Sequence, residues 1–368
     1  MFFVGRHMQR LLLIFIAILT TLVGVERTSA QELKLGADFT TLFDNTEYAE
    51  MQGISSGTLF GARLTPKLGV EWRERNSLMV GVDMFQDFGY DAKFLSDARL
   101  QLYYAYQAPR VKLFVGVFPR YYMRGLQSQL FFDRSYRYYN NTIGGVLARY
   151  EDNRFEGSYV EFAMDYTGMR DFNTREAFSI MSSGRMNIAL FYFGYDFHMG
   201  HYAKDHNPAT HDGVVDNLLL TPYIGYRFSV NKSAQPINFD IRLSYVQSLQ
   251  RDRINENVWN YPSGAELFVE VEWYNVRLSN RLYASRGSLF TYYDRYGSEL
   301  YFGHPLYNVT KGNIYDAISL SYSRSFFDST LAVEAGITAE YNGAEWGTRQ
   351  WLQLSVALDY GVKFKNNK

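Results

Sequence analysis

The segment 350–364 reads QWLQLSVALDYGVKF and carries the clearest structural signal in the chain. From Leu352 to Phe364 every second residue is apolar, and the residues between them are polar or small. Successive side chains of a β-strand point to opposite sides of the strand. The alternation therefore predicts a strand with one apolar face and one polar face.

The same alternation recurs along the chain. It is clear over 111–118, 237–245, 266–273 and 331–341, and each of these segments ends in an aromatic residue. Segments of about ten alternating residues flanked by aromatic residues are typical of transmembrane β-barrels, whereas the strands of soluble sandwiches are usually about five to six residues long. No long stretch shows apolar residues at helical spacing, so we expect few helices.

We predict an all-β fold, a transmembrane antiparallel up-and-down barrel of about sixteen strands. The expected strands are 32–42, 58–73, 78–88, 98–107, 111–119, 141–151, 155–167, 174–183, 187–197, 215–229, 237–248, 264–274, 276–285, 313–325, 329–341 and 350–364. Long connections alternate with short polar ones, as outer loops alternate with periplasmic turns in bacterial barrels. An even strand number places both termini on the periplasmic side. Fourteen to eighteen strands stay open, because 174–197 alternates poorly.

Composition excludes several other classes of protein. The 368 residues include no Cys, which excludes disulfides and thiolate metal sites. The 28 Phe, 5 Trp and 31 Tyr are too many apolar rings for a disordered chain. The formal net charge of −1 argues against a nucleic-acid-binding protein, which would need a basic excess. A mean hydropathy of −0.26 excludes a bundle of transmembrane helices.

The first thirty residues have the pattern of a cleaved secretory signal peptide. Arg6 and Arg10 precede the uncharged stretch 11–25, and small residues at Ser29 and Ala30 stand before Gln31. The stretch is short for a transmembrane helix, which needs about 20 residues. We therefore predict a signal peptide over 1–30 and a single β-barrel domain over 31–368.

Together, these features resemble the Gram-negative outer-membrane β-barrel proteins, and in size the porin-like ones. The resemblance is architectural, and the tyrosine-rich composition is similar to that of barrels from the Bacteroidota. It departs from the family pattern at the C-terminus, where Phe364 is followed by four polar residues instead of ending the chain. It implies location in the outer membrane, contact with outer-membrane lipid and insertion by the barrel-assembly machinery.

If the apolar face of each strand meets lipid, the opposite face lines the lumen. Basic candidates for this lining on the early strands are Arg63, Lys67, Arg99 and Lys112, and acidic candidates on the late strands are Glu266, Glu270, Glu272, Glu334 and Glu340. Two interpretations stay open. The two walls could face each other across a solvated pore, or the carboxylates at 266, 270 and 272 could pair locally with Arg277 and Arg281.

The third long connection, 120–140, is unusually rich in rings and arginines. Its candidates for a pore constriction are Arg120, Tyr122, Arg124, Arg134, Arg137 and Tyr139. A free external loop rarely exposes so many rings. The segment could fold into the pore, extend the outer aromatic girdle, or form a sugar-binding surface.

Four histidines gather near one outer loop and carry the remaining chemistry. His198, His201, His206 and His211 stand beside several aspartates, so a metal site is a candidate, although the spacing fits no standard motif. The cluster is also the best candidate for a hydrolytic histidine. Its serine partners would be Ser179, Ser182 and Ser183, which we expect nearest the opposite face of the membrane.

The function expected from the sequence is a porin-like channel for passive diffusion of small hydrophilic solutes, including sugars, and not an enzyme. One alternative is a closed barrel with a binding, adhesion or envelope-structural role, in which 120–140 and 286–312 pack together. A second alternative is a lipid hydrolase acting at the outer leaflet. No cofactor and no nucleic-acid partner is implied, and the sequence does not indicate an oligomeric state.

Overall fold

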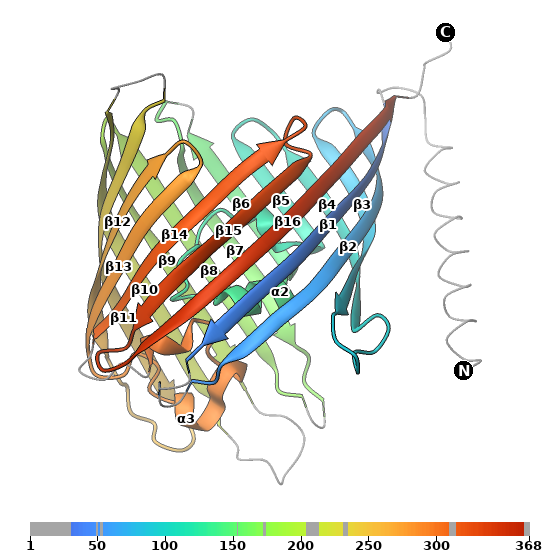
Figure 1. Cartoon of the computed structure of the whole chain (residues 1–368). Helices are drawn as coiled ribbons and strands as arrows, with labels where there is room; N and C mark the ends of the chain where they lie inside the picture. The colour runs from blue at the N-terminus through green and yellow to red at the C-terminus, as the bar shows by residue number, and fades with distance from the viewer. Residues whose placement is uncertain are drawn as a thin grey trace.

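A computed structural model describes residues 31–363 except 49–50, 52–53, 153, 172–173, 204–212, 231–234 and 309–313. Sixteen antiparallel strands form a closed barrel in which β1 pairs with β16 (Figure 1). The predicted fold and strand number are therefore confirmed. The predicted signal peptide, 1–30, lies outside the described residues.

Each strand pairs with its neighbours in chain order. The strands are β1 Gln31–Glu47, β2 Gly57–Trp72, β3 Asn76–Asp87, β4 Asp97–Gln107, β5 Val111–Pro119, β6 Thr142–Asp152, β7 Ser158–Gly168, β8 Ala177–Ile188, β9 Phe191–Tyr202, β10 Val215–Val230, β11 Ile237–Asp252, β12 Ser263–Trp273, β13 Val276–Arg286, β14 Ile314–Phe326, β15 Leu331–Tyr341 and β16 Trp346–Lys363. The short helices are η1 Arg120–Tyr122, α2 Arg134–Tyr139, α3 Tyr293–Tyr296, η2 Gly297–Glu299 and η3 Pro305–Tyr307. Below, the two ends of the barrel are called the turn end, with the short connections, and the loop end, with the long ones.

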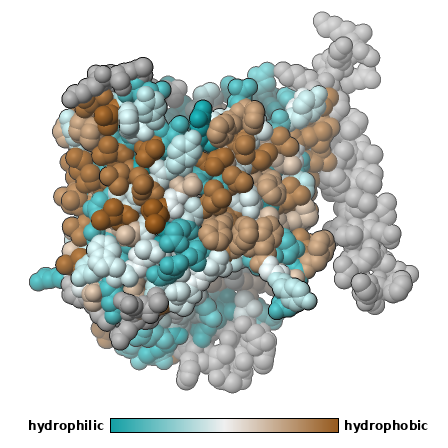
Figure 2. Space-filling view, in the orientation of Figure 1, coloured by the Kyte–Doolittle hydropathy of each residue, from teal (hydrophilic) through white to brown (hydrophobic). Residues whose placement is uncertain are grey.

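The apolar face of the strands points outward, as the alternation predicts. Exposed apolar side chains on this face include Leu35, Phe39, Leu64, Leu100, Phe162, Leu243, Leu278, Leu320, Leu352 and Leu358. In Figure 2 hydrophobic residues gather over the part of the wall nearer the turn end, and more polar residues cover the part nearer the loop end. Within the described part of the chain, no helix is both long and apolar enough to cross a membrane.

Two connections fold into the barrel and fill its loop half; we call residues 120–140 and 287–308 the plug. The first segment spans the lumen from wall to wall. The Leu126 amide donates to Asp196 on β9 at 3.0 Å, Ser128 Oγ lies 3.2 Å from Arg281 on β13, and Asp133 lies 3.2 Å from Arg349 on β16. Figure 1 shows α2 inside the barrel wall.

The two plug segments pack directly against each other, as the closed-barrel alternative requires. The Asp133 amide donates to the Phe302 carbonyl at 2.6 Å, and the His304 amide donates to the Gln129 carbonyl at 2.8 Å. Gly303 makes this approach possible, because a Cβ there would lie 2.1 Å from the Leu130 carbonyl oxygen.

A hydrophobic core therefore lies inside the barrel instead of between two sheets. Its fully buried members include Phe118, Ile143, Leu147, Leu289, Leu306 and Tyr307. Burial of each such side chain contributes about 1.5–3 kcal/mol of transfer free energy. The solvated lumen expected from the sequence is wrong for the loop half, because plug side chains occupy that space.

The strands β8 and β9, which alternate poorly in the sequence, have distinct faces in the structure. Phe191 and Phe193 are exposed on the outer face, while Met181 on the inner face belongs to the core that the plug completes. The inner face also carries polar side chains that contact the plug or one another, namely Ser179, Ser183, Asp196 and His198. These strands are therefore apolar outside and mixed inside.

Candidate active site

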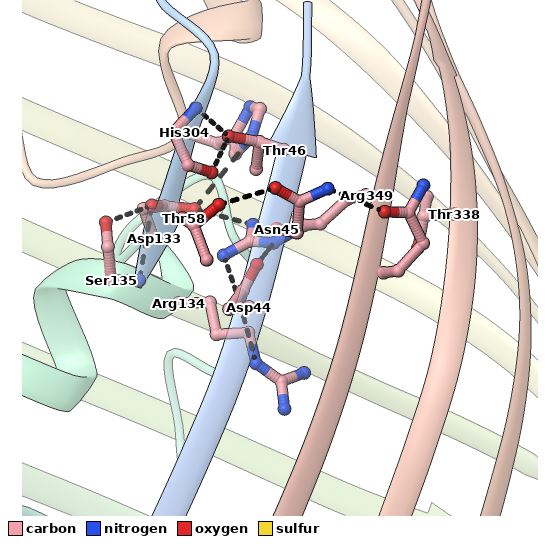
Figure 3. Close-up of polar contacts among 12 residues, drawn as sticks. Asp44, Asn45, Thr46, Thr58, Asp133, Arg134, Ser135, His304, Thr338 and Arg349 are labelled. Atoms are coloured by element: carbon pink, nitrogen blue, oxygen red, sulfur yellow. Dashed lines mark hydrogen bonds and ion pairs between the residues drawn. The ribbon is translucent and has the colours of Figure 1, made fainter. Parts of the chain in front are cut away.

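A cluster of polar side chains lies between the plug and the wall formed by β1, β15 and β16 (Figure 3). We call it the His304 cluster. Its members are Asp44, Tyr48, Asp133, Arg134, Ser135, His304, Glu340 and Arg349. The wall contributes Asp44, Glu340 and Arg349 from the loop ends of the strands, and the plug contributes the histidine.

His304 faces two carboxylates from one side of its ring. Its Nε2 lies 3.9 Å from Asp133 Oδ1, 3.9 Å from Glu340 Oε1 and 3.4 Å from the Tyr48 hydroxyl. On the other side, Nδ1 accepts the Leu306 amide at 3.3 Å, at the start of η3. The ring is therefore held by the backbone, and Nε2 is the nitrogen directed at the cluster.

Arg349 is held by one carboxylate of the wall and one of the plug. Its Nε and Nη2 each donate to Asp44 at 2.8 Å, and its Nη1 donates to Asp133 at 3.2 Å. Asp44 and Arg349 lie diagonally across the β1–β16 seam, where Asp44 is opposite Trp351 and Arg349 is opposite Thr46. Two parallel N–H···O bonds between Arg and a carboxylate give both strength and a fixed geometry.

Asp133 also begins α2. Its carboxylate accepts the Ser135 amide at 3.3 Å as the N-cap, and it accepts the Ser135 hydroxyl as well. Burial by itself would raise the pKa of Asp133, but His304 and Arg349 together hold that pKa well below its usual range. Asp133 therefore stays a carboxylate at neutral pH, and it is a poor proton acceptor.

Arg134 is the more accessible of the two arginines. Its Nε lies 3.2 Å from Asp44, and its guanidinium lies over the Trp351 ring at 4.8 Å. Its side chain is 24% exposed, compared with 5% for that of Arg349. Burial lowers the pKa of Arg134 to about 10, so this cation is charged at neutral pH.

The outer face of the same wall is polar beside the cluster. The Thr58 hydroxyl donates to Asn45 at 2.7 Å, and Asn45 donates to Gln350 at 3.0 Å. Asn45 and Gln350 are the strand neighbours of Asp44 and Arg349, and neighbouring side chains point to opposite faces. A polar belt on the outside thus lies at the level of the cluster on the inside.

A second histidine forms a different arrangement across the plug. His198 Nε2 lies 3.1 Å from Ser179 Oγ, and its ring lies against Phe132 and Phe302 at 5.6 and 6.0 Å between centroids. The expectation that Ser179 lies far from this histidine is wrong, because the β8–β9 register places Ser179 opposite Gly200 at the loop end. A nearby cavity of about 10 Å³ is lined by His198, by Asn217, Leu219 and Ser248 of the wall, and by plug residues.

The residues predicted to constrict a pore are engaged by the wall and by the plug itself. Arg120 donates to Asp165 at 2.6 Å, Tyr122 stacks on Phe114 at 4.2 Å, Arg124 lies over Tyr159 at 4.7 Å, Arg134 contacts Asp44, Arg137 donates to the Leu126 carbonyl at 2.6 Å, and Tyr139 donates to Asp87 at 3.4 Å. A role for them in narrowing an open pore stays a prediction.

The predicted lumen charges are largely paired with near neighbours. Arg63 pairs with Asp83, Lys67 with Asp38 and Asp359, Arg99 with Asp97, Glu266 with Arg281, Glu270 and Glu272 with Arg277, and Glu340 with Tyr48 and Tyr315, while Lys112 and Glu334 lie on β5 and β15. The local pairing across the β12–β13 hairpin is therefore present. A transverse field between two walls stays a prediction.

Two members of the predicted metal cluster, His206 and His211, lie outside the described residues. Of the other two, His198 points into the lumen, whereas His201 lies against Phe178 at 4.8 Å. In the described ranges, no group of three or more His, Asp or Glu side chains is placed to hold a metal ion.

A family model described as Lipid A 3'-O-deacylase-type matches residues 25–364. The chain belongs to this family. The prediction that it is not an enzyme is therefore wrong, because the family is an enzyme family by its description. The comparison with curated proteins finds no match.

Among solved structures, the barrel is similar to a loop-deletion mutant of OmpT, an outer membrane protein of Vibrio cholerae. The identity is 10% and the TM-score 0.52, with 89% of this chain and 99% of that chain covered. An anion-selective porin from Comamonas acidovorans matches at 11% identity and a TM-score of 0.44, with 90% and 100% covered. The chain thus has the fold of an outer-membrane β-barrel protein.

Sequence reasoning missed most of the His304 cluster. Strand ends drawn at 42 and 350 left Asp44 and Arg349 in connections, whereas β1 runs to Glu47 and β16 begins at Trp346. His304 is the single histidine of the predicted connection 286–312, and the residues that face it are far away in the sequence. Two members of the cluster were among the candidates from the sequence: Arg134 as a constriction residue and Glu340 as an inward-facing charge on β15.

Proposed function

We propose that this chain is a hydrolase that removes an ester-linked acyl chain from a glycolipid of the lipid A class. The observation that carries the proposal is the geometry of His304, whose Nε2 faces two carboxylates beside Ser135 and Arg134. The family description supplies the substrate class and the bond to be cleaved.

Ester hydrolysis needs a group that moves a proton to and from the attacking and leaving oxygens. We assign this role to His304, since Nε2 faces the cluster while Nδ1 is occupied by the Leu306 amide. Asp133 and Glu340 orient the ring and stabilise its protonated form. Asp133 is ill suited as the base itself, because His304 and Arg349 keep its pKa low despite burial.

The tetrahedral intermediate of acyl transfer carries an oxyanion that needs a fixed positive partner. Arg134 is the candidate, because it is partly exposed and is held by Asp44 and Trp351. Arg349 is less available, since Asp44 and Asp133 already occupy its donors. Ser135 and a water molecule are the two candidate nucleophiles, and both fit this arrangement of charges.

The wall gives the substrate a route from the membrane. A headgroup at the polar belt of Asn45, Thr58 and Gln350 would lie one wall thickness from the cluster. Lipid acyl chains would contact the apolar part of the same face (Figure 2). This places the scissile ester at the loop end, where the long connections are expected to face the outside of the cell.

The test is acyl release from purified lipid A by the full chain in detergent, followed by mass spectrometry. His304→Asn should lower the rate at least about 100-fold, the usual contribution of a general acid–base group. His198→Asn is the matched control and should change it less than about threefold. No release by a folded wild-type barrel would overturn the proposal, and selective loss in His198→Asn would move the site to His198 and Ser179.

A passive channel is the second candidate, favoured by the sixteen-strand size and by open space at the turn end of the lumen. Small hydrophilic solutes, including sugars, would be its substrates. Single-channel conductance of the wild-type protein in a planar bilayer tests it. Discrete steps that scale with salt concentration would support a channel, and their absence in a folded barrel would exclude one.

A further inference from the structure

The turn half of the lumen contains a cavity that the hydrolase does not use. The cavity has a volume of about 420 Å³ and lies between the early strands, β16 and η1. The lining residues that matter here are Lys34, Lys67, Glu71, Tyr121, Tyr122 and Asp359. The His304 cluster lies at the other end of the same strands, so the cavity is a separate site.

Carboxylates outnumber ammonium groups around this cavity. Lys67 is shared by Asp38 at 3.1 Å and Asp359 at 3.2 Å. Lys34 is shared by Glu32 at 3.1 Å and Glu71 at 3.5 Å. Four carboxylates thus hold two cations; of these groups Glu71, Asp359 and the two lysines line the cavity, whereas Glu32, Asp38 and Lys112 are not among the lining residues.

The two lysines differ in access: Lys34 (35% exposed) is slightly more exposed than Glu71 (29%), whereas at Lys67 the anion is the more accessible partner. The Lys67 side chain is 9% exposed, whereas that of Asp359 is 73% exposed. An entering solute therefore meets carboxylate oxygens before it meets the enclosed ammonium group. A free anion would find no unshared cation in the lining, so anionic solutes are disfavoured.

Tyrosine rings form the plug side of the cavity. Tyr121 is 60% exposed, and its hydroxyl donates to Asp38 at 3.3 Å. Tyr122 is fixed behind it by stacking on Phe114, and its hydroxyl lies 3.2 Å from that of Tyr103. The face of a tyrosine ring attracts a cation placed within about 6 Å of its centre.

We propose that this cavity binds a small organic cation, a solute that carries one or more protonated amines. The amines would pair with Asp359 and Glu71, and an adjoining alkyl segment would lie on Tyr121. The volume falls in the range of about 300–1,000 Å³ that is typical of small-molecule sites. Because the plug fills the loop half, the solute enters from the turn end, which is expected to face the periplasm.

The experiment is isothermal titration of spermidine into the full chain in detergent. The wild type should bind it, with an affinity that falls as NaCl is raised. The double variant Asp359→Asn with Glu71→Gln should bind at least about tenfold more weakly, and Tyr121→Ala several-fold more weakly. Asp152→Asn with Asp328→Asn removes two carboxylates from other turns and should change the affinity less than twofold.

Folding of every variant is checked by circular dichroism and by its heat-dependent shift in gel mobility. Absence of spermidine binding by the folded wild type would overturn the proposal. Equal weakening in both double variants would also overturn it, because that outcome indicates diffuse attraction to the barrel. A sugar site would be indicated instead if sucrose displaced spermidine and bound the variant Asp359→Asn with Glu71→Gln as tightly as it binds the wild type. That result would also overturn the proposal.

Discussion

The two halves of the lumen have walls built by the same rule and contain different things. In both halves ionic groups of the inner face pair across neighbouring strands. In the loop half two long connections supply apolar rings and a histidine, and the space is filled. In the turn half the connections that the structure describes are short, and a cavity remains. Wall alternation thus fixes the barrel, while the connections decide what the barrel contains.

Removal of the first plug segment should have the largest effect on the difference between the filled loop half and the open turn half. Replacement of 126–139 by a short Gly-Ser linker should join the two halves into one open lumen, because Asp133, α2 and the rings at 131–132 are lost. We expect large salt-dependent conductance steps and complete loss of acyl release. A folded variant that gives no steps would show that the second segment alone closes the barrel.

Removal of one buried arginine from the loop half should lower the free energy of unfolding more than removal of an exposed arginine from the turn half. Arg349→Met leaves Asp44 and Asp133 without their main partner, and breaking a buried pair costs about 3–5 kcal/mol. Arg277→Met, in an exposed ion pair of the turn half, should cost at most about 1 kcal/mol. Urea unfolding in detergent measures both. Equal costs would contradict the distinction between the halves.

The contact between the two plug segments can be loosened by one methyl group. Gly303→Ala places a Cβ against the Leu130 carbonyl, and relief of that clash should cost about 1–3 kcal/mol. Faster trypsin cleavage after Arg124, Arg134 and Arg137 would report the loosened plug. Gly57→Ala on β2 provides the control for effects outside the contact, since its Cβ would meet no atom within 4 Å and its φ is not positive.

The smallest expected effect is a change in alkaline stability. Burial raises the pKa of Tyr136, in α2, to about 12. The neutral ring is favoured in the folded state, so its contribution is complete below pH 10 and is lost as pH rises from 10 to 12. Tyr136→Phe should reduce this loss without altering stability at pH 8 by more than about 1 kcal/mol. Unfolding curves at pH 8, 10 and 11.5 test it, and an unchanged alkaline loss would contradict it.

The sequence predicted the wall far better than its contents. Residues that face lipid on one side must alternate, so the sixteen strands could be read from positions such as Leu352 to Phe364. The strands continue beyond the apolar belt at the loop end, where Asn45 and Gln350 face outward and the alternation disappears. Asp44 and Arg349 were missed for that reason, although both lie on the inner face.

The partners of plug residues could not be predicted, because they join positions far apart in the chain. The rings of 120–140 indicated a segment that avoids water, but nothing local indicated Phe302 or His304 as their neighbours. Family membership supplied what the site residues alone did not. His304 gave no catalytic signal in the sequence, because the carboxylates that face it come from β15 and from the other plug segment.

The wall-to-wall anchoring of the plug has a consequence for assembly. Residues 120–140 are synthesised before β13 and β16, which carry the Arg281 and Arg349 that hold them. The plug can therefore settle only after the last strand has joined the first. Until then Ser128 lacks Arg281 and Asp133 lacks Arg349, so this part of the plug stays accessible to chaperones and proteases in an unfinished barrel.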